Sequence, residues 1–184
     1  EIFASTDGKQ MEGILLTDKT ASTLYYPHVQ GDGWWTGIVA YNPSTSSCSI
    51  TVTPYDAQGN ALTTSSRIIQ GKAKYVGSVA ELGLPAQTAW FKIDSTVPLS
   101  GFELIGSNDY EQLGGYAGNG GTGAKSGVFA KIEPGLTTIA LVNTESSTAS
   151  VTLTAYDNYG TAIGSQTHTI GGYAKTTNSP EGFF

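Results

Sequence analysis

The chain has 184 residues and a formal net charge of −6, and only 13% of its residues are charged. This length suits one large domain or two small ones. The negative charge disfavours nucleic acid, because binding to phosphates needs clustered Lys and Arg side chains. No apolar run approaches the roughly 20 residues that span a bilayer. We therefore expect no nucleic-acid partner and no insertion into a membrane.

The predicted elements are short strands in which apolar and polar residues alternate. In residues 48–54 the apolar side chains alternate with Ser49, Thr51 and Thr53, as in a strand with one face in a core and one in water. Residues 78–82 are predicted to form a single helical turn, and residues 149–155 repeat the alternation of 48–54. Many short strands between turns indicate an all-β fold of antiparallel β-sandwiches. The other predicted strands are residues 35–41, 61–69, 88–93 and 101–106.

The chain contains an internal repeat. Residues 35–62 return as residues 136–163, a shift of 101 positions, and 11 of these 28 positions are identical. A fixed period indicates tandem copies of one structural unit. Each copy follows its repeated strand with an Asp and, three residues later, a Gly, so we expect a hairpin turn of three to five residues there.

The repeat is out of phase with the ends of the chain. Residues 1–13 correspond to residues 103–115 and thus to the end of a unit, while the second copy has no counterpart of residues 86–102. We predict a terminal strand at residues 1–13, a first sandwich at 14–115 and a second, incomplete sandwich at 116–184. Both sandwiches are expected to be immunoglobulin-like or jelly-roll-like. The glycine-rich residues 114–123 are predicted to form a flexible linker.

Two explanations account for the incomplete second copy, since a sandwich that lacks a strand exposes main-chain groups and apolar side chains. Either the chain is a piece of a longer array, or the strand comes from elsewhere. In the second case, residues 1–13 dock into an open copy of the same or a neighbouring chain through Ile2, Phe3 and Met11. Docking between neighbours is head-to-tail and builds filaments. The expected partners are further copies of the chain or adjacent repeats.

No set of catalytic residues stands out. The lone Cys48 is predicted to be a small core residue, and His28 and His168 stand where the other copy has cations, which is typical of solvated positions. Asp56 and Asp157 lie in turns beside glycine, where Asp is expected for conformational reasons, although such loops can also bind Ca²⁺. We predict a non-catalytic protein without a metal or another cofactor.

Aromatic residues supply the alternative function, a carbohydrate-binding module. Exposed rings can stack on the faces of sugars, and Trp34, Trp35 and Tyr26 lie close together in the sequence. Trp35 corresponds to Leu136, which indicates a buried position, whereas Trp34 corresponds to Gly135 and is the better candidate for exposure. Packing in a core or an interface is the competing explanation for the cluster. Glycans are therefore the alternative partners.

A family resemblance rests on strand and turn motifs. The first copy has Trp34-Trp-Thr-Gly-Ile, Asn42-Pro and Tyr55-Asp-x-x-Gly59, together with residues 100–107. The second copy contributes residues 128–133 and 140–145. These motifs resemble the tandem β-sandwich repeats, of about 100 residues each, in large bacterial secreted or surface proteins. The resemblance implies an extracellular or cell-surface spacer, fibre unit, surface-layer unit or adhesive element, and it implies no particular functional residue.

Overall fold

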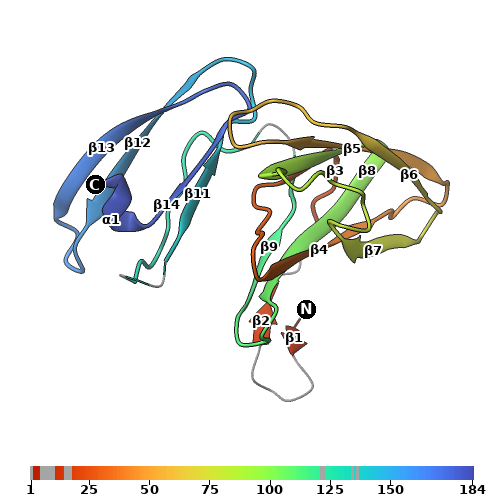
Figure 1. Cartoon of the computed structure of the whole chain (residues 1–184), viewed down its shortest axis with the longest axis horizontal. Coiled ribbons are helices and arrows are strands. Elements are labelled where there is room, and N and C mark those ends of the chain that lie inside the picture. Colours follow the sequence, from red (N-terminus) through yellow and green to blue (C-terminus); the bar gives the residue numbers. More distant parts are fainter. Residues whose placement is uncertain (1, 5–10, 15–17, 121–122, 134, 136) are drawn as a thin grey trace.

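The computed structural model describes residues 2–4, 11–14, 18–120, 123–133, 135 and 137–184. Nearly all of the regular structure is antiparallel β-strand, which confirms the prediction of an all-β fold (Figure 1). Among the described residues, no helix is long and apolar enough to cross a bilayer. The strands before residue 121 are β1 (Ile2–Ala4), β2 (Met11–Gly13), β3 (Ala21–Tyr26), β4 (Trp34–Tyr41), β5 (Cys48–Tyr55), β6 (Ser65–Ile69), β7 (Lys74–Ser78), β8 (Trp90–Ser107), β9 (Leu113–Ala117) and β10 (Asn119–Gly120).

Strand β8 organises the first unit, which we define as β3 to β10. Its first part pairs with β3 and β5, and its last part pairs with β4 and β9. One layer has the order β10-β3-β8-β5-β6 and the other the order β9-β8-β4-β7, so β8 belongs to both. The two strands expected at residues 88–93 and 101–106 are therefore one strand. Pro98, which has no N–H to donate, lies between the residues paired with β5 and those paired with β4.

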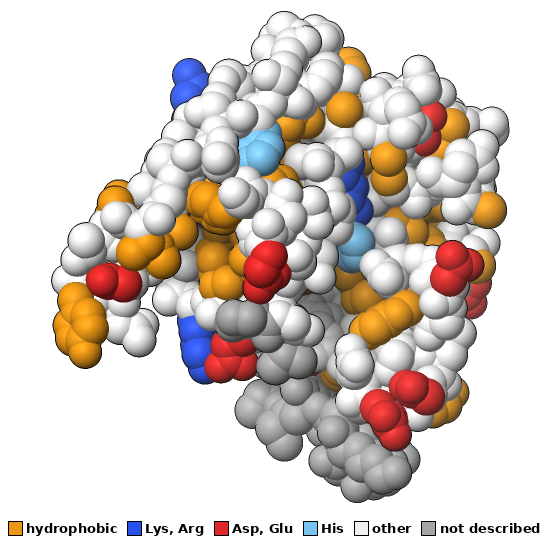
Figure 2. Space-filling model, turned by 60° about the vertical axis from the view of Figure 1, so that its left-hand side comes forward, with side chains coloured by type: hydrophobic (Ala, Val, Ile, Leu, Met, Phe, Trp, Pro, Cys, Tyr) orange, Lys and Arg blue, Asp and Glu red, His pale blue; other side chains and the backbone are white. Residues whose placement is uncertain are grey.

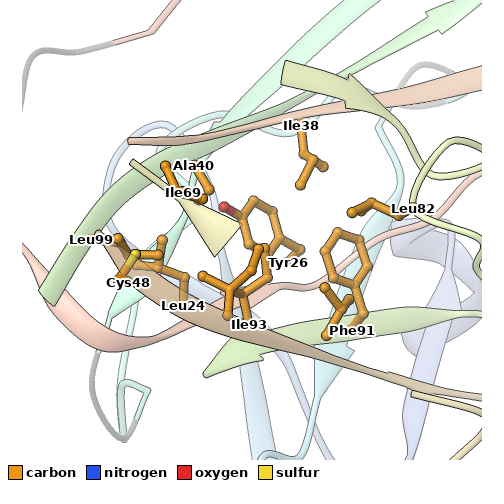
Figure 3. Packing of buried hydrophobic residues seen from close by; sticks show 12 residues of the cluster. Leu24, Tyr26, Ile38, Ala40, Cys48, Ile69, Leu82, Phe91, Ile93 and Leu99 are labelled. Atoms are coloured by element: carbon orange, nitrogen blue, oxygen red, sulfur yellow. The ribbon is translucent and has the colours of Figure 1, made fainter. Parts of the chain in front are cut away.

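The core of the first unit lies between these layers (Figure 3). Inward side chains of β3, β4, β5 and β8 meet there, and Tyr26 stacks on Phe91 with ring centroids 4.7 Å apart. Cys48 is 3% exposed and belongs to this cluster, as the sequence predicted. Burying an aliphatic or aromatic side chain of this size contributes roughly 1.5–3 kcal/mol. Burial of the inward side chains between the layers therefore stabilises the packing of one layer against the other.

The second unit, which we define as β11 to α1, repeats part of the first. Its elements are the counterparts of β4, β5, β6, β7 and residues 79–82 at a shift of 101. Here β11 pairs with β14 and β12 pairs with β13, so each sheet has two strands. The elements are β11 (Ile139–Val142), β12 (Ala149–Tyr156), β13 (Ala162–Ile170), β14 (Lys175–Asn178) and α1 (Pro180–Phe183).

A buried asparagine fixes the same loop in both units. The Nδ2 atom of Asn42 donates to three backbone carbonyls at 2.9, 3.3 and 3.2 Å, and that of Asn143 donates to three carbonyls at 2.7, 3.2 and 2.9 Å. Such bonds satisfy carbonyls that would otherwise be buried without a donor. The acceptors correspond at a shift of 101: Ser46, Ile69 and Gln70 in the first unit, and Ser147, Ile170 and Gly171 in the second.

The N-terminal strands have the same register as the β8–β9 hairpin. Phe3 lies opposite Glu12, and Ile105 lies opposite Gly114, which is the same pair at a shift of 102. Residues 2–4 and 11–13 thus pair with each other in the way that the end of the first unit does. Their docking into another copy stays a prediction. The apolar side chains named for that docking lie outside the described part of the structure: Ile2, Phe3 and Met11.

The glycine-rich segment is not a linker over its first part. Strand β9 pairs with β8, and β10 pairs with β3, so the prediction of a linker is wrong for residues 114–120. The glycines allow close packing. A Cβ atom on Gly115 would lie 2.9 Å from Leu104 Cδ2, and one on Gly120 would lie 2.5 Å from Ala21 Cβ.

Candidate functional site at the junction of the two units

The turn between β13 and β14 lies against the end of the first unit. The indole N–H of Trp90 donates to the carbonyl oxygen of Tyr173 at 2.8 Å, and the backbone N–H of Lys175 donates to that of Ala57 at 3.0 Å. The ring of Tyr55 stacks between its neighbours, with its centroid 4.4 Å from that of Trp90 and 5.2 Å from that of Tyr173. Both aromatic packing and main-chain hydrogen bonds therefore join the units.

Gly59 allows the two backbones to touch at this junction. It has a φ of +93°, and a Cβ atom there would lie 2.2 Å from the carbonyl oxygen of Gly172. Its counterpart Gly160 has a φ of +86°, but a Cβ atom there would have no heavy atom within 4 Å. The positive φ requires glycine in both turns, and the contact with the second unit adds a further requirement at Gly59.

Lys175 and His28 form a polar cluster behind this contact. The ammonium group of Lys175 donates to the carbonyl oxygen of Ala89 at 2.8 Å and to Nδ1 of His28. On the other side of the ring, Nε2 of His28 lies 2.5 Å from Oε1 of Gln30. These partners assign a neutral imidazole with its proton on Nε2. Burial and the charge of Lys175 lower the pKa of His28.

Glu103 of β8 is fully buried next to this cluster. Neither of its carboxyl oxygens has a hydrogen-bond partner among the described residues. Burial raises the pKa of Glu103 to about 8, opposed by the charge of Lys175. Burial also lowers the pKa of Lys175 to about 8, opposed by the charge of Glu103. Burial therefore disfavours the charged form of both side chains, and each charge partly offsets this effect on the other.

Perturbed acids and bases of this kind occur both in active sites and in structural networks. Catalysis would need a substrate within reach of the titrating groups. Here Glu103 is 0% exposed, and the polar atoms of Lys175 and His28 already bind each other and other groups of the protein. This geometry favours holding the two units together over transfer of a proton to a bound molecule.

The sequence prediction missed this site. One local signal was present, because Glu103 lies in phase with the inward residues Leu99 and Ile105 of its strand. Lys175 and His28 gave no such signal in the sequence. Lys175 corresponds to Lys74 in the other copy, and His28 was predicted to occupy a solvated position. Instead, His28 is half-buried between the units. The contacts between the units could not be predicted from the pattern of polar and apolar residues within either unit.

The aromatic residues predicted to bind glycans do not form one exposed platform. Tyr26 is fully buried, and its hydroxyl group donates to the carbonyl oxygen of Val39 at 3.1 Å, so its ring offers no face to a sugar. Trp35 lies across Gly106, where a Cβ atom would be 2.4 Å from the indole ring. Trp34 is half-buried. The packing role that competed with sugar binding therefore describes Tyr26 and Trp35.

The two predicted hairpin turns are confirmed, and hydrogen bonds within them account for the Asp residue in each turn. Oδ1 of Asp56 accepts from two backbone N–H groups at 3.0 and 2.9 Å, and Oδ1 of Asp157 accepts from the two equivalent groups at 2.9 and 2.8 Å. Hydrogen bonds within the turns hold the pKa of both carboxyls below the usual value. In the described part of the chain, no group of three or more His, Cys, Asp or Glu side chains could hold a metal ion.

No protein-family profile matches this chain, and no curated protein does. Among solved structures, the chain is similar to one described as the crystal structure of Thermotoga maritima 1070, with 15% sequence identity and a TM-score of 0.48. The match covers 56% of this chain and 97% of the other. Likeness of this degree carries no assignment of fold or function.

Proposed function

We propose that this protein is a non-catalytic structural module, built from tandem β-sandwich repeat units, which acts as a spacer, fibre unit or surface-layer unit outside the cell. The observation that carries the proposal is the junction between the units. Its contacts involve main-chain atoms of Ala57 and Tyr173, which hold position more tightly than contacts between mobile side chains alone. A fixed relation between successive units is what a spacer or a lattice requires.

The repeat itself supports sandwiches as the unit of assembly. In the first unit one core is shared by side chains from both layers, and the second unit has counterparts of β4, β5, β6 and β7 with the same buried asparagine. The second unit thus has counterparts of strands from both layers of the first, which supports the sandwich as the repeated element. Low charge and strands rich in Ser and Thr, together with the resemblance to secreted and surface repeats, support a location outside the cell.

The test is whether the two units keep one relative position in solution. Spin labels attached at two equivalent exposed positions, Ser66→Cys and Thr167→Cys, would report the distance between the units by double electron–electron resonance. Both substitutions are made in a Cys48→Ala background, so that no other cysteine carries a label. We expect a narrow distribution of distances that broadens in Lys175→Met, since this variant loses the buried ammonium. A matched pair within the first unit, Ser66→Cys with Gln87→Cys, should stay narrow in both proteins.

A broad distribution in the protein with Lys175 intact would contradict the proposal, because the units would then move independently. Catalytic turnover that Glu103→Gln abolishes would contradict it as well. The carbohydrate-binding alternative stays a prediction, and the burial of Tyr26 removes one of its three rings. Its test is the change in tryptophan fluorescence when polysaccharide is added.

A further inference from the structure

Equivalent strands of the two units differ in how far their inward faces are buried. In β5, the four inward side chains from Cys48 to Pro54 are all buried. In β12, the four counterparts from Ala149 to Ala155 are all partly exposed, although the alternation is the same. Figure 2 shows hydrophobic side chains gathered on this open side of the molecule. The inward face of β12 is therefore formed, but the described residues cover it only in part.

The difference comes from the neighbours of each strand. In the first unit, β5 lies between β6 and β8, and β4 lies between β7 and β8. In the described part of the second unit, β12 pairs with β13 alone and β11 pairs with β14 alone. The open edges of β11 and β12 are thus the two edges that β8 occupies in the first unit. A strand edge with free N–H and C=O groups is a template for pairing.

We propose that the open edges of β11 and β12 bind one extended strand with the pattern of β8, supplied by an adjacent repeat unit. This inference rests on the proposed function and names the partner of its second unit. The strand runs antiparallel to β12 first and then pairs with β11, as β8 does with β5 and β4. Addition of a strand gives affinity through main-chain hydrogen bonds and specificity through alternate side chains.

The register of the first unit specifies which side chains the strand brings. Val52 lies opposite Ile93 in the first unit, and its counterpart in β12 is Leu153, so an aliphatic side chain is expected opposite Leu153. In the same way, Pro54 lies opposite Phe91, and its counterpart in β12 is Ala155, so a second apolar side chain is expected opposite Ala155. The partner is therefore a strand with alternate apolar residues toward the core, and not a loop or a helix.

The aromatic end of β12 independently indicates a further unit. Tyr55 lies opposite Trp90 and is 6% exposed, whereas its counterpart Tyr156 is 63% exposed and has no such ring over it among the described residues. Gly160, the counterpart of the glycine at the junction, has open space where Gly59 touches the second unit. The far end of the second unit thus repeats the surface on which the first unit holds its neighbour.

A synthetic peptide with the sequence of residues 88–107, carrying terminal lysines for solubility, tests this inference on the full chain. We expect saturable binding of one peptide, measured by fluorescence anisotropy, and slower hydrogen exchange in β11 and β12, measured by mass spectrometry. Leu153→Asp should weaken binding at least tenfold, whereas Thr152→Asp, on the outward face of the same strand, should leave it unchanged. A peptide carrying Ile93→Asp should bind the unchanged protein as weakly as the original peptide binds the Leu153→Asp variant. This comparison needs no substitution in the protein.

Several outcomes would overturn the inference. These are no binding at millimolar peptide, equal binding by the Leu153→Asp and Thr152→Asp variants, and protection confined to the first unit, which would mean exchange with its own β8. Dimers that form without peptide and protect β12 would assign the face to a second copy. If the spin-label distance is narrow and the peptide does not bind, only this inference fails. If the distance is broad and the peptide binds, the proposed function fails instead.

Discussion

Replacing Glu103 with glutamine should change how the stability of this protein depends on pH. The substitution keeps the shape of the buried side chain and removes its ionisation. In the folded protein the pKa of Glu103 is raised from 4.5 to about 8, mainly because burial penalises the charged form. Each tenfold change in a protonation equilibrium is worth about 1.4 kcal/mol, so the range from 4.5 to about 8 corresponds to about 5 kcal/mol.

The direction follows from the protons bound in each state. Below pH 4.5 the Glu103 carboxyl is protonated in the folded and in the unfolded chain, and its full contribution to stability is present. Between pH 4.5 and about 8 the unfolded chain releases this proton while the folded chain keeps it, so the free energy of unfolding falls as the pH rises. Glutamine does not titrate. Compared with their difference below pH 4.5, the Glu103→Gln variant should therefore gain stability over the wild type as the pH rises, by about 4 kcal/mol at pH 8.

Urea unfolding at pH 5, 6, 7 and 8, followed by tryptophan fluorescence, measures this difference. Trp90 is 1% exposed at the junction and reports its opening. Glu111→Gln is the matched control, because Glu111 is exposed and its replacement should leave the curve parallel to the wild type. If the Glu103→Gln curve also stays within about 0.5 kcal/mol of the wild type at every pH, Glu103 is not a buried neutral acid and the reasoning is refuted.

Three further measurements test other contacts. Gly160→Ala should lower the free energy of unfolding by about 1–2 kcal/mol because the residue has a positive φ. Gly59→Ala should lower it by about 3–5 kcal/mol because the added Cβ atom also pushes two backbones apart. Equal losses of unfolding free energy in urea for the two variants would contradict the close contact. Asn42→Ala and Asn143→Ala should each cost about 2–4 kcal/mol in thermal unfolding, since three carbonyls lose their donor, and losses below about 1 kcal/mol would count against that role. The buried Cys48 should react with a thiol reagent only as fast as the protein unfolds, and rapid labelling in native buffer would show an open core.

The strands and turns were predictable because their signals are local. The strand expected at residues 35–41 is Trp34–Tyr41, and the alternation in 48–54 and 149–155 marks β5 and β12 to within one residue. The Asp-x-x-Gly turns were predictable for the same reason. The continuity of β8 was not, because the local pattern breaks near Pro98 while the strand is held by partners on both sides.

The junction depends on residues that are distant in the sequence. Lys175 and His28 are separated by 147 positions, and their contact exists only because two units meet. The glycine-rich residues 114–120 were misjudged for a related reason. Composition alone does not separate a flexible linker from a strand whose glycines let neighbouring side chains approach closely.

The place of β8 in the chain also has a consequence for folding. This strand pairs with partners far back in the sequence, for instance where Thr23 bonds to Asp94 across 71 positions, and such non-local pairing forms slowly. During synthesis, β3 to β7 emerge before β8, and β12 emerges after it, so β8 meets its own partners first. When the whole chain refolds from denaturant, β5 and β12 offer β8 the same alternation at the same time. Refolding in vitro should therefore populate a misassembled form with β8 on the wrong unit, which the order of synthesis avoids.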